Sequence, residues 1–214
     1  MTKTDIEAMF MVKEFPTFPD ESWYENISLP ISWNLVRGKL KNKKVLDIGC
    51  GNGWVSWWAR KEGADITACD IFGTYIHPSI PFVLAHNEKL PFKDGSFDMI
   101  LTANVLHHGN LNETVKEVYR VLKEGGRLIS LQEPCINNET SEEEYLKTNL
   151  QKELDLGIDE HRPSLDKYKR ALSVFKNVDF YYMGDRMFVE PQTKILEKVT
   201  TDDYHGGIAI RAIL

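Results

Sequence analysis

From residue 43 to residue 53 the chain carries the sequence Lys-Lys-Val-Leu-Asp-Ile-Gly-Cys-Gly-Asn-Gly. The apolar residues 45, 46 and 48 form a run of the length expected for a buried parallel strand. Three alternating glycines follow, and residues 54–60 then have helical spacing. Glycines permit a sharp turn and let a ligand approach the backbone, while the unpaired N–H groups of the next helix favour an anionic group. The stretch therefore predicts a strand, a ligand-binding turn and a helix.

Two classes of ligand use such a turn. Dinucleotide-binding folds require G-x-G-x-x-G. Here Gly49, Gly51 and Gly53 give G-x-G-x-G, and Trp54 occupies the position of the last glycine of that fingerprint. An indole at this position argues against a pyrophosphate close over the helix start. A purely structural turn is the remaining alternative.

The segment Val-Leu-Asp-Ile-Gly-Cys-Gly-Asn-Gly resembles the first motif of the class I S-adenosylmethionine-dependent methyltransferases, and the resemblance extends over residues 43–134. It implies a doubly wound α/β fold with a mostly parallel, seven-stranded, Rossmann-like sheet whose last strand is antiparallel. It also implies S-adenosyl-L-methionine as the cofactor and methyl transfer to oxygen, nitrogen or carbon of a small-molecule acceptor. The candidate cofactor-binding residues are Asp47, Gly49, Cys50, Gly51, Asn52, Gly53, Asp70, Ile71, Asn87, Glu88, Leu90 and Asn104.

The ribose and adenine contacts depend on the segments that follow the glycine turn. Residues 65–70 predict a second strand ending in Asp70, where a carboxylate can accept hydrogen bonds from both ribose hydroxyls; an acid that caps the next turn is the alternative. Prolines leave little room for a full crossover helix in residues 71–81. The next segment resembles the family's Asp-Ala-Glu-x-Leu-Pro-Phe, but His86 replaces the acid that holds the adenine amino group. Asn87 or Glu88 then takes over that contact, or Leu90 holds the base by apolar contact.

Four residues are candidates for proton transfer. His107 and His108 resemble the family's Leu-His-His turn, and one of them is expected to take a proton from a hydroxyl or amine while the other packs. Adjacent histidines cannot share one face of a helix, so no metal site is predicted. Glu133 follows the fifth predicted strand as a candidate base or a helix-capping acid. His161 lies in a polar segment that is either a substrate-recognition loop or a plain surface loop.

Length and composition limit the organisation of the chain. The 214 residues suffice for one α/β domain, with an aromatic-rich cap or lid over residues 1–42 and the cofactor-binding domain over residues 43–214. Beyond residue 134, helices are predicted over 145–156 and 164–175 and strands over 178–183 and 207–214.

Charge and cysteine usage predict the partners and the compartment. A net charge of −6 provides no basic field for nucleic acid, and no apolar run is long enough for a membrane span. Three widely spaced cysteines favour a reduced, cytoplasmic protein. We expect a small-molecule substrate and a monomer or homodimer, without a nucleic-acid or membrane partner. Two other functions stay open: an NAD(P)-dependent oxidoreductase, which Trp54 disfavours, and a non-catalytic domain that binds S-adenosylmethionine or S-adenosylhomocysteine.

Overall fold

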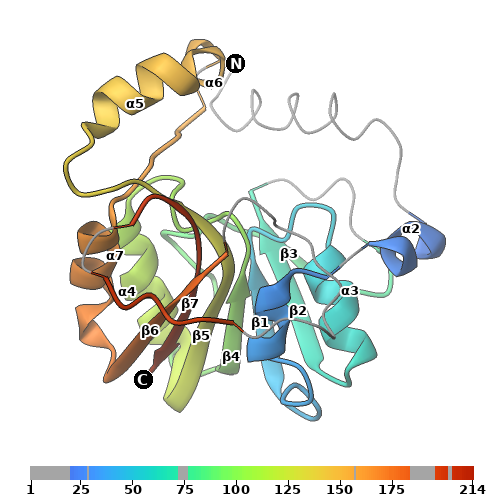
Figure 1. Ribbon diagram of the computed structural model, residues 1–214. Coiled ribbons are helices and arrows are strands. Elements are labelled where there is room, and N and C mark those ends of the chain that lie inside the picture. The colour runs from blue at the N-terminus through green and yellow to red at the C-terminus, as the bar shows by residue number, and fades with distance from the viewer. Residues whose placement is uncertain (1–19, 28, 72–76, 157, 184–195, 202–203) are drawn as a thin grey trace.

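The computed structural model describes residues 20–27, 29–71, 77–156, 158–183, 196–201 and 204–214. Their strands form a seven-stranded sheet in the order β3-β2-β1-β4-β5-β7-β6 (Figure 1). The parallel part comprises β1 (Lys44–Ile48), β2 (Asp65–Asp70), β3 (Phe82–Leu84), β4 (Phe97–Thr102) and β5 (Leu122–Cys135). Strand β7 (Gly206–Ile213) lies antiparallel between β5 and β6 (Asn177–Tyr182). The predicted fold class and the antiparallel last strand are confirmed.

Both faces of the sheet are covered, as the continuous apolar run of β1 predicts. Neighbouring residues of a strand point to opposite faces, and Val45 and Leu46 accordingly belong to different apolar clusters. The cluster around Leu46 includes residues of α4 (Leu111–Val121) and α7 (Leu165–Ala171). The cluster around Val45 includes residues of α3 (Trp54–Lys61) and of the 3-10 helix η1 (Ile31–Leu35). Helices on both sides leave the carboxyl ends of the parallel strands as the edge where polar groups gather.

The helices after β5 differ in part from the prediction. A single helix was expected over 145–156, but α5 (Glu142–Asn149) begins earlier and Leu150 separates it from α6 (Gln151–Asp155). Neither helix buries a residue, and the pair stands off the sheet as an arm (Figure 1). The helix expected over 164–175 is α7 followed by the 3-10 helix η2 (Leu172–Val174), and the Ser164 side chain makes no capping hydrogen bond.

The described part of the N-terminal segment packs on the core. Helix α2 (Glu21–Asn26) carries Tyr24 and η1 carries Trp33, and both side chains are completely buried. Residues 1–19 of the predicted cap and residues 72–76 of the predicted short crossover lie outside the described residues. Among the helices that the structure describes, none has the length and apolar character needed to cross a membrane.

Candidate functional site

The glycine turn brings the ends of β1 and β2 together. Gly49, Gly51 and Gly53 all have positive φ (64°, 50° and 77°), a conformation that favours glycine, and Gly53 is the N-cap of α3. The backbone N–H of Gly51 donates to Oδ2 of Asp70 across 2.8 Å. Asp70, at the end of β2, therefore lies directly beside the glycine turn, as its distance along the sequence predicts.

Gly49 also approaches the segment after β4. A Cβ at this position would lie 2.3 Å from Cγ2 of Val105, whereas a Cβ at Gly95, with a similar φ of 60°, would meet nothing within 4 Å. We expect Gly49→Ala to lower the free energy of unfolding by about 3 kcal/mol, from left-handed strain plus overpacking, and Gly95→Ala by about 1 kcal/mol from strain alone. Urea unfolding measures both values. Equal losses would show that Val105 does not confine the turn.

Asp47 is a buried carboxylate without a cation among the described residues. Its side chain is buried, and the hydroxyl of Ser56 donates to its Oδ2 across 2.6 Å. Burial raises the pKa of Asp47 to about 7, the charge of Asp70 adds to that effect, and the hydrogen bond from Ser56 opposes it. The buried Oδ1 of Asn52 has no hydrogen-bond partner within the part of the chain that the structure describes. The carboxylates of Asp47 and Asp70 and the free Oδ1 of Asn52 lie at the same turn. They fit a ligand that carries a positive charge and hydrogen-bond donors.

Three aromatic side chains, of which Tyr24 belongs to the cap, lie beside the turn. The hydroxyl of Tyr24 donates to the backbone carbonyl of Asn52, and its ring stacks on Trp57 with the centroids 5.4 Å apart. His77 adds a third ring, 4.5 Å from that of Trp57. Cys50 fills the turn as a small buried side chain, and its N–H donates to the carbonyl of Cys69 across 3.1 Å. The cap therefore contacts the predicted cofactor turn directly, while its role as a lid stays a prediction.

The candidates for the adenine contact connect two loops. Asn87 donates to the carbonyl of His108 across 3.2 Å, and Glu88 accepts the N–H of Asn110 across 2.5 Å. Leu90 is buried. These contacts fix residues 86–90 against the turn after β4.

Glu133 holds that turn in place. A register shift between β5 and β7 separates Ser130 from Glu133, whose side chain is completely buried. Its Oε1 accepts the N–H groups of Val105 and Leu106, each across 3.1 Å, and the hydroxyl of Ser130 across 2.8 Å. Its Oε2 lies 2.8 Å from Nδ1 of His107. Burial opposes ionisation, but the hydrogen bond and charge of His107 and the two N–H groups outweigh it and lower the pKa of Glu133.

Two of the candidate bases meet a residue that the sequence did not suggest. The rings of His107 and His108 lie 4.1 Å apart, and Nε2 of His107 lies 3.7 Å from Oε2 of Glu160. Burial lowers the pKa of His108, and the charge of His107 adds to that effect. His161 points elsewhere: its Nδ1 lies 3.4 Å from Glu142.

The prediction against a metal rested on spacing, because adjacent histidines cannot share one face of a helix. Residues 103–110 have no helix; they form turns and bends, in which adjacent side chains can converge. The helical spacing rule therefore does not apply to this turn, and the absence of a metal stays a prediction.

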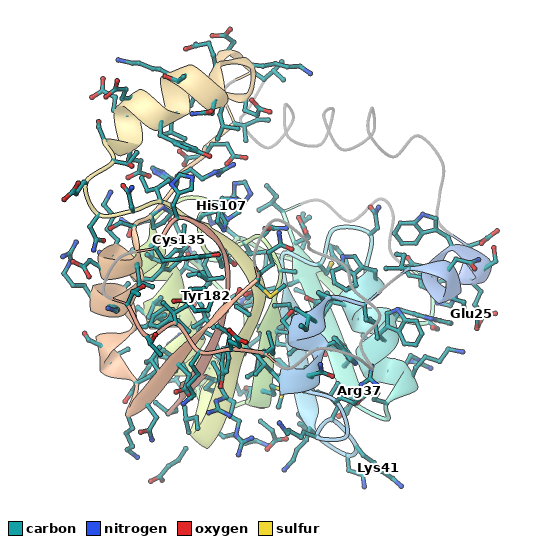
Figure 2. All side chains as sticks on the ribbon, viewed as in Figure 1. Glu25, Arg37, Lys41, His107, Cys135 and Tyr182 are labelled. Atoms are coloured by element: carbon teal, nitrogen blue, oxygen red, sulfur yellow. The ribbon has the colours of Figure 1, made fainter. Side chains whose placement is uncertain are left out.

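A cavity of about 180 Å³ opens at the same edge of the sheet. Asn104 borders it with a φ of 56°, unusual for a residue with a side chain, and donates its N–H to the carbonyl of Gln132 across 2.8 Å. Figure 2 shows His107 and Cys135 at this edge, below the arm of α5 and α6. The residues that line the cavity are Asn104, Gln132, Pro134, Cys135, Ile136, Tyr145, Arg162, His205, Gly206 and Gly207.

Three further residues of the site escaped the sequence analysis. Ser56 lies one helical turn after Gly53, so its spacing was available as a signal for a partner of Asp47. Tyr24 was one of many aromatic residues in the cap and carried no distinguishing signal. Glu160 belongs to a polar segment 27 positions after Glu133, and only the fold brings it to His107.

Comparison with known proteins agrees with this geometry. Residues 46–130 match the family model described as methyltransferase domain. An uncharacterized protein of Methanocaldococcus jannaschii is 34% identical over 132 residues, which cover 55% of this chain and 52% of that protein. The demethylmenaquinone methyltransferase of Streptomyces griseus is 34% identical over 96 residues, 41% of each chain. The matches thus span about half or less of these curated relatives.

The fold likeness extends further than the sequence likeness. The crystal structure of an S-adenosylmethionine-dependent methyltransferase from Mesorhizobium loti superposes with a TM-score of 0.61 at 15% identity, covering 89% of this chain and 100% of that one. At this identity the likeness concerns the fold alone. The strand order of the present sheet is that of the predicted fold class. The chain therefore carries a methyltransferase domain and has the fold of the class I S-adenosylmethionine-dependent methyltransferases.

Proposed function

We propose that this chain is an enzyme that transfers a methyl group from S-adenosyl-L-methionine to a small-molecule acceptor. The observation that carries the proposal is the turn at Gly49, Gly51 and Gly53, with Asp47 and Asp70 beside it, inside a matched methyltransferase domain. A turn that carries two buried carboxylates repels a pyrophosphate, so the nicotinamide-dependent alternative is disfavoured on charge as well as on Trp54.

The cofactor supplies a methyl group already activated on a sulfonium. In this proposal Asp70 accepts hydrogen bonds from the ribose hydroxyls, and Asp47 with Asn52 favours the cationic amino-acid end. Gly49, Cys50, Gly51 and Gly53 provide backbone that approaches the cofactor closely, and the backbone at Asn104 meets its amino-acid end, next to the acceptor cavity. Ile71, Asn87, Glu88 and Leu90 surround the adenine. The protein thus contributes mainly alignment and exclusion of water.

The acceptor occupies the cavity bordered by Asn104 and Arg162. The cluster of His107, His108 and Glu160 handles the acceptor's proton, and Glu133 positions His107 from behind. His161 stays a second candidate base near the rim. The net charge of −6 supports a small molecule over a nucleic acid. We propose a cytoplasmic location, because the three cysteines are buried and free, and a monomer or homodimer.

The test is an acceptor screen with methyl-labelled S-adenosylmethionine, grouped into quinols, phenols, amines and activated carbons. We expect formation of S-adenosylhomocysteine that depends on one of these groups and disappears in Asp70→Asn. A chain that binds the cofactor but methylates no acceptor group would favour the non-catalytic binding domain.

A further inference from the structure

We propose that His107, His108 and Glu160 bind a divalent transition-metal ion of the zinc class, with Glu133 as the carboxylate that orients His107. These three side chains each offer one ligand atom, and the ligand atoms lie within 4.8 Å of one another. The described residues include this one group of three such side chains in ligand range. Imidazole and carboxylate together suit zinc and its neighbours in the first transition row.

The contact between His107 and Glu133 is the first argument. Histidines that ligate metals commonly donate their other ring N–H to a carboxylate, which fixes the tautomer. Here Nδ1 of His107 lies 2.8 Å from Oε2 of Glu133, whose other oxygen accepts three further donors. This contact favours the tautomer with the proton on Nδ1, which leaves Nε2, the atom that faces Glu160, as the ligand atom.

The distance between His107 and Glu160 is the second argument. Nε2 and Oε2 are 3.7 Å apart, which is too long for a hydrogen bond. Two ligand atoms of one tetrahedral zinc ion lie about 3.4 Å apart, given bonds of about 2.0–2.2 Å. The pair is therefore spaced for a shared ion, and the ligand atom of His108 lies within 4.8 Å of both.

Charge is the third argument. Glu133 and Glu160 place two carboxylates at the cluster against the single guanidinium of Arg162, whose Nη1 lies 2.5 Å from Oε2 of Glu160. The carboxylates therefore outnumber the guanidinium in a nearly enclosed site, where the side chains of His107 and Glu160 are 5% and 12% exposed. A bound cation compensates this charge.

Three protein ligands leave a coordination position open, as in catalytic rather than structural zinc sites. An acceptor hydroxyl or a water at that position would lose its proton more easily. This catalytic role rests on the proposed methyl transfer, whereas metal binding itself does not.

The experiment uses the tag-free full chain, stripped with a chelator and titrated with Zn²⁺ alone by calorimetry, with metal content measured after dialysis. We expect about one ion per chain. His108→Ala and Glu160→Gln should each lower the affinity at least 100-fold, since changes in the outer shell alone cost about 10–100-fold. His161→Ala is the matched control, because His161 adjoins Glu160 but contacts Glu142 and Asp159 outside the cluster.

Binding of S-adenosylhomocysteine, measured on the same samples, separates this inference from the proposed function. Variants that lose zinc should keep the cofactor product. A parent chain that retains less than about a tenth of an ion, or zinc binding unchanged in both His108→Ala and Glu160→Gln, would overturn the metal site and leave the cofactor site untouched. Loss of S-adenosylhomocysteine binding with intact zinc binding would overturn the methyltransferase proposal alone.

Discussion

Asp70→Asn is expected to lower the affinity for S-adenosylhomocysteine about 100-fold. A charged acceptor contributes about 1.5–3 kcal/mol for each hydrogen bond, and the substitution removes the charge and one of the two acceptor oxygens offered to the ribose. Asparagine keeps an oxygen for the N–H of Gly51, so the turn itself should survive. Calorimetric titration measures the change in affinity.

Asp65→Asn is the matched control for this result, because Asp65 is the exposed first residue of the same strand, at its opposite end. It should leave the affinity unchanged. Equal affinities of the parent and Asp70→Asn would show that the ribose is held elsewhere and that Asp70 only fixes the turn.

Asp47→Asn is expected to change the pH dependence of stability. In the folded chain the pKa of Asp47 is raised to about 7 from an ordinary value of 3.8. Between these values the folded state holds a proton that the unfolded state has lost, so this group lowers the stability as pH rises and has no further effect above about pH 7. The variant lacks this slope. The difference in free energy of unfolding between the variant and the parent should therefore shift by about 3 kcal/mol in favour of the variant from pH 5 to pH 8.

Ser56→Ala is the companion variant for Asp47. The hydroxyl of Ser56 donates to Asp47 across 2.6 Å and lowers its pKa. Without this bond the pKa rises further, and the decline in stability should continue above pH 7. Urea unfolding at four pH values between 5 and 8.5 follows both variants. A parent and an Asp47→Asn variant with parallel profiles would contradict the assignment of this titration to Asp47.

Local sequence was sufficient for the elements that dominate the fold. About thirty residues contain the signals: the apolar run of β1, the glycines after it and the spacing to Asp70. These signals predicted the first strand, the turn after it and the position of Asp70 at the end of the second strand. The closing strands were also placed within one residue of β6 and β7. These segments succeed because burial on both faces of the sheet enforces the same pattern that the sequence displays.

The candidate site was harder to predict because its contacts are long-range. Glu133 was expected just after its strand, but it lies inside β5, beyond the register shift that follows Ser130, and there its side chain meets His107. His107 and His108 lie in a turn, as predicted, but their neighbours there donate backbone N–H groups to Glu133, a contact that local sequence does not indicate. Glu160 belongs to a segment whose composition indicates only a polar loop, so its contact with His107 could not be predicted.

The most direct test of the account is calorimetric titration of the full chain with S-adenosylhomocysteine, with NADH as the control. The turn at Gly49, Gly51 and Gly53, flanked by Asp47 and Asp70, predicts one molecule of S-adenosylhomocysteine bound per chain and no heat from NADH. Binding of NADH, or no binding of S-adenosylhomocysteine, would contradict the claim that this turn is a site for S-adenosylmethionine.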